Sequence, residues 1–178
     1  MSKKSLLGLL DYQDAYDVLV KLYRSDSAIA AKIDAIIQAK YGSVDSLEVA
    51  FFVKKALMSV TDERVLSYCN SYPGYKPPYE AIYELLDEEM ETFREKMDQY
   101  VDFKLPSLIR DYFLGVMKGL DDFIDYCRHY GDEHCTLDDA TNIAEDFFEK
   151  YHSKLASKDK LKAKSFFDSC HLAWGKEL

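Results

Sequence analysis

Residues that break helices are scarce in this chain, and the densest group of them lies in one short segment. The 178 residues include seven glycines and four prolines, and three of the prolines fall within residues 70–78. Long segments without glycine or proline favour helices over short strands joined by turns. We therefore expect an all-α fold in a single domain spanning 1–178, with a loop at about 70–78 that separates two helical halves.

Apolar residues recur at three- and four-residue spacings along almost the whole chain. Boundary signals divide this pattern: Asp26 or Ser27 caps one helix, Thr61 caps another, and Pro78 and Pro106 begin the two longest. The pattern predicts seven or eight helices. We expect them to form an irregular bundle or a short array of antiparallel helix pairs.

Two features predict how particular helices pack. On the helix that Ser43 or Asp45 opens, Leu47, Phe51 and Leu57 are expected to point inward. Gly115 and Gly119 lie four residues apart on a later helix, where each costs roughly 1 kcal/mol relative to alanine. A face with no side chains lets a neighbouring backbone approach closely. We expect it to serve internal packing, with a symmetric homodimer as the alternative.

Charge is distributed unevenly along the chain, whose formal net charge is −9. Residues 61–103 contain four basic and eleven acidic residues, whereas residues 150–178 contain seven and three. The acidic balance argues against nucleic acid as a partner, because a basic surface supplies most of that affinity. Either both regions are solvated faces, or the basic C-terminal helix packs beside, or swaps onto, the acidic centre.

Nothing in the sequence predicts a membrane or an export signal. No apolar run reaches about 18 residues, and the N-terminal leucines are interrupted by Asp11 and Asp14. The four cysteines, at 69, 127, 135 and 170, are irregularly spaced and do not suggest a disulfide framework. We therefore expect a cytoplasmic protein with reduced thiols and no membrane partner.

A group of possible metal ligands lies near a predicted helix end. Cys127, His129, His134 and Cys135 place four donors in nine residues, and tetrahedral zinc needs four. The spacing matches no standard zinc finger, and Cys127 also fits the apolar stripe of its helix. We expect buried cysteines, exposed histidines and no cofactor, with zinc as the alternative.

Tyrosines form the most localised signal in the chain. Five of the fourteen lie between residues 68 and 83, around the 70–78 loop. A tyrosine offers a large rigid surface with a polar tip, which suits interfaces. Tyr72, Tyr75 and Tyr79 are therefore candidate binding residues, and packing of this loop against the fold is the alternative.

The stretch from 72 to 123 resembles a known helical region. The residues that carry the likeness are Tyr75, Pro78, Glu80, Ala81, Glu84, Leu85, Leu86, Glu89, Phe93, Tyr100, Tyr112, Gly115, Gly119, Leu120 and Phe123. They are similar to the all-helical region that follows the SWIM-type zinc finger in uncharacterised prokaryotic proteins. The resemblance implies an all-α fold and a prokaryotic source. The finger itself is absent here, so its zinc and nucleic-acid roles do not carry over.

No phosphate-binding glycine loop, nucleophile elbow or catalytic triad spacing is present in the sequence. We therefore predict a protein-interaction or scaffold module without catalytic activity, acting on an unidentified protein partner. The alternative is a helical metal- or small-molecule-binding protein that uses the cysteine and histidine cluster at 127–171.

Overall fold

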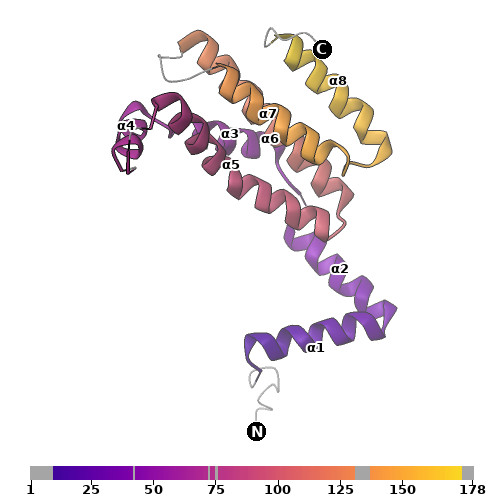
Figure 1. Cartoon of the computed structure of the whole chain (residues 1–178). Helices are drawn as coiled ribbons and strands as arrows, with labels where there is room; N and C mark the ends of the chain where they lie inside the picture. The colour runs from indigo at the N-terminus through magenta and orange to yellow at the C-terminus, as the bar shows by residue number, and fades with distance from the viewer. Residues whose placement is uncertain (1–9, 42, 72, 75, 131–136, 174–178) are drawn as a thin grey trace. The chain divides into compact units, whose positions relative to one another are not determined.

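The structure is a computed structural model that describes residues 10–41, 43–71, 73–74, 76–130 and 137–173. These residues form eight α-helices and no strand, which confirms the predicted all-α fold (Figure 1). The helices are α1 (Tyr12–Ser25), α2 (Ser27–Tyr41), α3 (Ser46–Leu57), α4 (Asp62–Ser71), α5 (Pro78–Asp102), α6 (Pro106–Tyr130), α7 (Leu137–His152) and α8 (Ser157–Ala173).

The chain divides into two compact units between Ser43 and Val44. The first unit, Met1–Ser43, contains α1 and α2, and the second, Val44–Leu178, contains α3 to α8. The division therefore falls before α3, and not at the 70–78 loop where the sequence analysis placed a separation. Across that loop α4 and α5 pack against each other, so the loop joins two parts of one unit.

Helix α6 is the centre of the second unit. It contributes twelve buried residues and packs against α3, α5, α7 and α8. On the other side of the unit, α7 contacts both α5 and α8 and lies between them (Figure 1). The buried side chains of these helices form one hydrophobic cluster, in which Phe113, Phe147 and Tyr151 are the largest fully buried members.

The closest packing in the second unit is between α3 and the glycine face of α6. A Cβ atom added to Gly115 would lie 2.8 Å from the Ser46 carbonyl oxygen, and one added to Gly119 would lie 2.6 Å from the Val53 Cβ. The Ser46 hydroxyl donates a hydrogen bond of 3.0 Å to the Asp111 carbonyl oxygen. The glycines therefore serve internal packing, as predicted. Because α3 occupies this face, a second copy cannot dock there.

This packing also determines which face of α3 is buried. Ala50 and Val53 are buried against α6, whereas Leu47 is 74% exposed and Phe51 is 61% exposed. The prediction that Leu47 and Phe51 point inward is therefore wrong, whereas Leu57 is buried as predicted. Where α3 meets the glycine face, the small Ala50 and the β-branched Val53 make the contact, and Leu47 and Phe51 are turned outward.

The two longest helices, α5 and α6, have 25 residues each and are therefore about 38 Å long. Both carry charged side chains along their length. No helix in the described part of the chain is long and apolar enough to cross a membrane.

Helix propensity alone predicts that alanine in place of a glycine of α6 stabilises the helix, whereas the close contact with α3 predicts the opposite. Gly119→Ala should lower the free energy of unfolding by about 2 kcal/mol, because the new methyl group overlaps the Val53 side chain and the Ala50 carbonyl oxygen. Urea unfolding followed by circular dichroism measures this change.

Ser165→Ala is the matched control, because Ser165 is exposed on α8. It should change the stability by less than about 0.5 kcal/mol. A Gly119→Ala variant as stable as the wild type would contradict the close approach of α3 to α6.

Candidate functional site

An open groove of about 650 Å³ lies between α4, the turn that precedes it and α5. Thr61 sets the start of α4, because its hydroxyl accepts a 3.4 Å hydrogen bond from the Arg64 backbone N–H. The groove is lined by hydroxyl groups, one aromatic ring and side chains of both charges. Among them are Ser59, Arg64, Ser67, Tyr68, Leu85 and Glu88.

Arg64 joins the two walls of this groove. Its Nη1 atom donates hydrogen bonds to the Glu89 carboxylate at 2.5 Å and to the Ser59 hydroxyl at 3.2 Å, and its Nη2 atom lies 3.6 Å from the Glu88 carboxylate. The guanidinium group is thus held by α5 and by the turn before α4. The Glu88 side chain stays 67% exposed at the rim, where a ligand could contact it.

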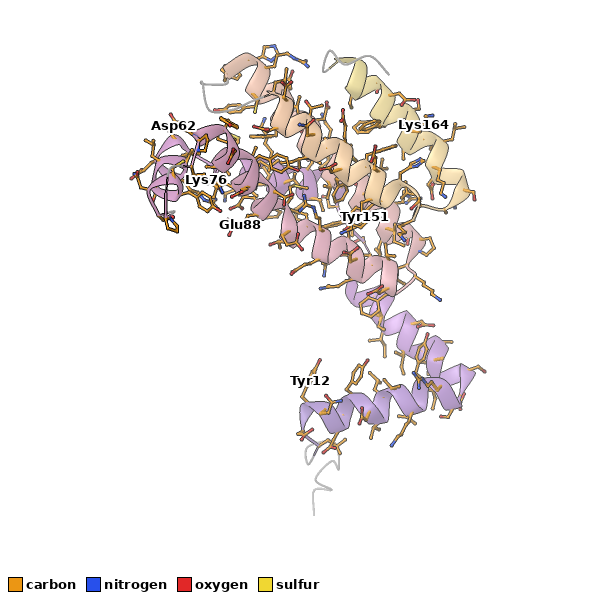
Figure 2. The ribbon with its side chains drawn as sticks, viewed as in Figure 1. Tyr12, Asp62, Lys76, Glu88, Tyr151 and Lys164 are labelled. Carbon is orange, nitrogen blue, oxygen red and sulfur yellow. The ribbon has the colours of Figure 1, made fainter. Side chains whose placement is uncertain are left out.

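A second polar cluster fastens the chain that leads into α5. The Lys76 side chain is only 7% exposed, and its ammonium group pairs with the Glu84 carboxylate. The same ammonium group lies 5.2 Å from the centre of the Tyr68 ring, and the Tyr68 hydroxyl donates a 2.9 Å hydrogen bond to Glu84. Figure 2 shows Lys76 beside α4, at the end of the unit that carries Asp62. These contacts hold α4, the chain before α5 and α5 in a fixed arrangement.

The outward face of α5 carries a continuous row of carboxylates, which we call the acidic stripe. Its members are Glu84, Glu88, Glu91, Glu95, Asp98 and Asp102, and all six are exposed. Their spacing alternates between four and three residues, which keeps them on one face of the helix over about 27 Å. Glu88 lines the groove, so the stripe continues from the groove along α5.

The three tyrosines predicted to bind a partner are only partly described. Tyr79 is 62% exposed, and its hydroxyl lies 3.4 Å from a carboxylate oxygen of Glu80. Tyr72 and Tyr75 lie outside the described residues. Tyr68, which belongs to the same cluster in the sequence, lines the groove instead.

The sequence does not single out two charged residues of the site, Arg64 in the groove and Lys76 in the neighbouring polar cluster. Arg64 carried a recoverable signal, because it is the one basic residue on α4 and faces a helix rich in carboxylates. No such signal exists for Lys76, because a lysine in a proline-rich segment gives no indication that it will be buried.

The possible metal ligands are divided between described and undescribed residues. Cys127 is buried and disulfide-bonded, so the expectation of reduced thiols is wrong at this position, while Cys69 and Cys170 carry free thiols. His129 is exposed and its Nδ1 atom lies 2.9 Å from the Asp125 carbonyl oxygen. His134 and Cys135 lie outside the described residues.

Within the described ranges, no three histidine, cysteine or acidic side chains are grouped to hold a metal ion. A sulfur atom in a disulfide offers no thiolate to zinc, so a site that uses Cys127 would require the bond to be reduced. The zinc site therefore stays a prediction.

Comparison with known proteins finds no relative for this chain. No protein-family model, curated protein or solved structure matches it. The resemblance to the helical region that follows the SWIM-type finger therefore stays a prediction.

The Lys76 cluster predicts a specific pH dependence of stability. Hydrogen bonds from Lys76 and then from Tyr68 hold the pKa of Glu84 below its ordinary value of 4.5. Such a carboxylate stabilises the fold above its unfolded pKa, and this contribution is lost as the pH falls through the lower, folded pKa. Glu84→Gln should therefore flatten the fall in melting temperature below pH 4.5.

Glu95→Gln is the control, because it makes the same charge change on the same exposed face of α5. Its acid profile should follow that of the wild type. If Glu84→Gln also retains the wild-type profile, Glu84 is not the carboxylate that links this cluster to acid stability.

The buried thiol of Cys170 should react slowly in the native protein. Burial raises the pKa of Cys170 to about 12, so only about one thiol in ten thousand is ionised at pH 8. Iodoacetamide should label Cys170 at least roughly 100-fold more slowly in the native protein than in guanidinium chloride. Mass spectrometry of the peptides measures both rates, and equal rates would contradict the burial of this thiol.

Proposed function

We propose that this protein is a helical protein-interaction module, without catalytic activity, that binds a basic amphipathic segment of a partner protein. The binding surface is the groove between α4 and α5, together with the acidic stripe of α5. The observation that carries this proposal is the continuity between the two: Glu88 lines the groove and is also a member of the stripe.

The chemistry of the groove supports a ligand with both apolar and basic groups. Leu85 and the ring of Tyr68 offer apolar contact, while hydroxyl groups offer hydrogen bonds. Arg64 and Lys76 are each already paired with carboxylates of α5. The charge that a ligand would meet at the rim is therefore negative. Electrostatic complementarity of this kind gives specificity and speeds association.

The length of the acidic stripe supports a helical ligand. Six carboxylates over about 27 Å match the reach of a helix of about 18 residues laid along α5. Several of them already have cationic neighbours, such as Arg94 beside Glu91 and Lys150 beside Asp98. The Glu91 carboxylate is 61% exposed, and both members of the Lys150–Asp98 pair are 51% exposed. Contacts of such exposed carboxylates are weak, so a ligand lysine can compete for them.

A designed peptide of 18 residues, with leucines on one face and lysines on the other, tests this proposal. Fluorescence anisotropy should show that the wild-type protein binds it and that the matched leucine–glutamate peptide does not bind. Reversing two charges with Glu88→Lys and Glu91→Lys should weaken binding at least roughly tenfold, because the rim then repels the lysines.

The matched control reverses two exposed acidic residues on α7, with Asp138→Lys and Glu149→Lys. It changes the net charge of the protein equally, but neither residue lines the groove. Equal loss of affinity in both double variants would show only general charge attraction and would contradict a site on α5.

A further inference from the structure

In its described part, the first unit contains helices but no core of its own. None of residues 10–37, 39 and 43 is buried, and none of them belongs to the hydrophobic cluster of the protein. Helices of 14 and 15 residues, the lengths of α1 and α2, are only marginally stable alone in water. The Tyr23 hydroxyl donates a 3.0 Å hydrogen bond to Asp34 of α2, but this contact is exposed. The pair of helices therefore needs an additional apolar contact.

One face of α1 offers that contact. Its large apolar side chains recur at spacings of three and four residues, so they form one stripe along the helix. The members are between 42% and 87% exposed, and Figure 2 shows the Tyr12 side chain standing out from the first turn. The α1 stripe consists of Tyr12, Tyr16, Leu19, Leu22 and Tyr23.

We propose that the α1 stripe packs against the α1 stripe of a second copy of this chain, with the two helices antiparallel. The area of the stripe is sufficient for this. With roughly 200 Å² for a whole tyrosine side chain, the three tyrosines expose about 370 Å² per chain. Two copies, with their leucines included, would bury about 1,000 Å², which is the size at which specific interfaces begin.

The charges of α1 favour a second copy in the antiparallel direction. Asp11, Asp14 and Asp17 lie in or before the first half of the helix, whereas Lys21 and Arg24 lie in the second half. An antiparallel pair places the acidic half of each helix beside the basic half of the other, while a parallel pair places like charges together. These residues lie on the side of α1 away from the stripe, so salt screens their attraction across the pair and they favour the antiparallel direction only weakly.

The antiparallel arrangement also places the side chains of the two α1 stripes opposite one another. When the two-fold axis passes between residues 17 and 18, Tyr12 of one copy lies opposite Tyr23 of the other, and Tyr16 lies opposite Leu19. Aromatic and aliphatic groups then meet along the whole contact. A closed two-fold pair is also the commonest form of homo-oligomer.

Sedimentation velocity over a concentration series tests the association. The wild-type chain should be a dimer, and Leu19→Glu should raise its dissociation constant at least roughly 100-fold, because a carboxylate would be buried at the centre of the interface. Gln13→Glu is the matched control, since it adds the same charge on the polar face of α1. A wild-type chain that stays monomeric up to about 100 µM, because α1 docks elsewhere or on nothing, would overturn the proposal. A dimer that Leu19→Glu leaves intact would overturn it too.

Single cysteines test the direction of the helices. Leu19→Cys lies close to the proposed axis and should form a disulfide with its own copy under mild oxidation. Tyr12→Cys should not, because the two cysteines would lie about 16 Å apart along the helices. A mixture of the Tyr12→Cys and Tyr23→Cys chains should form the mixed disulfide.

Peptide mass spectrometry distinguishes these bonds from those of the native cysteines, and the wild-type chain is the control. Self-linked Tyr12→Cys together with an unlinked Tyr12–Tyr23 mixture would show a parallel pair and would contradict the proposal. The peptide-binding experiment on the groove does not involve α1, so the two proposals can fail separately.

Discussion

The close approach of α3 to the glycine face of α6 is the contact on which the second unit depends. Gly115 and Gly119 bring the backbones of α3 and α6 together. As a result, α3 meets α6 through side chains that are small or β-branched, such as Ala50 and Val53. The position of α3 in turn fixes the turn at 58–61, from which α4 begins. The groove lies between that turn, α4 and α5, so its shape follows from a glycine contact made elsewhere in the unit.

Local signals predict the helices well and the packing of their faces less well. The starts at Pro78 and Pro106 are found correctly, because the rigid φ of proline acts within one residue of the boundary. The face of α3 is predicted wrongly, because hydrophobicity favours burying Leu47 and Phe51. Which face is buried is decided by the shape of α6, and helical periodicity alone cannot report that shape.

The candidate site can likewise be predicted only in part, because its contacts depend on how the helices pack. The tyrosine cluster singled out in the sequence includes Tyr68, which lines the groove. Arg64 and Lys76 take their roles from partners 25 and 8 residues away, which only the packed structure brings close. Irregular cysteine spacing predicts reduced thiols, and this prediction is wrong for Cys127, which is disulfide-bonded.

A double-mutant cycle between Gly119→Ala and Val53→Ala tests the central contact most directly. If the methyl group at 119 destabilises the fold by meeting Val53, shortening Val53 should relieve part of that cost. The double variant should then be more stable than the two single losses predict, by about 1 kcal/mol, measured by urea unfolding. Additive losses would show that the two residues do not meet, and would contradict the glycine contact as the basis of the fold.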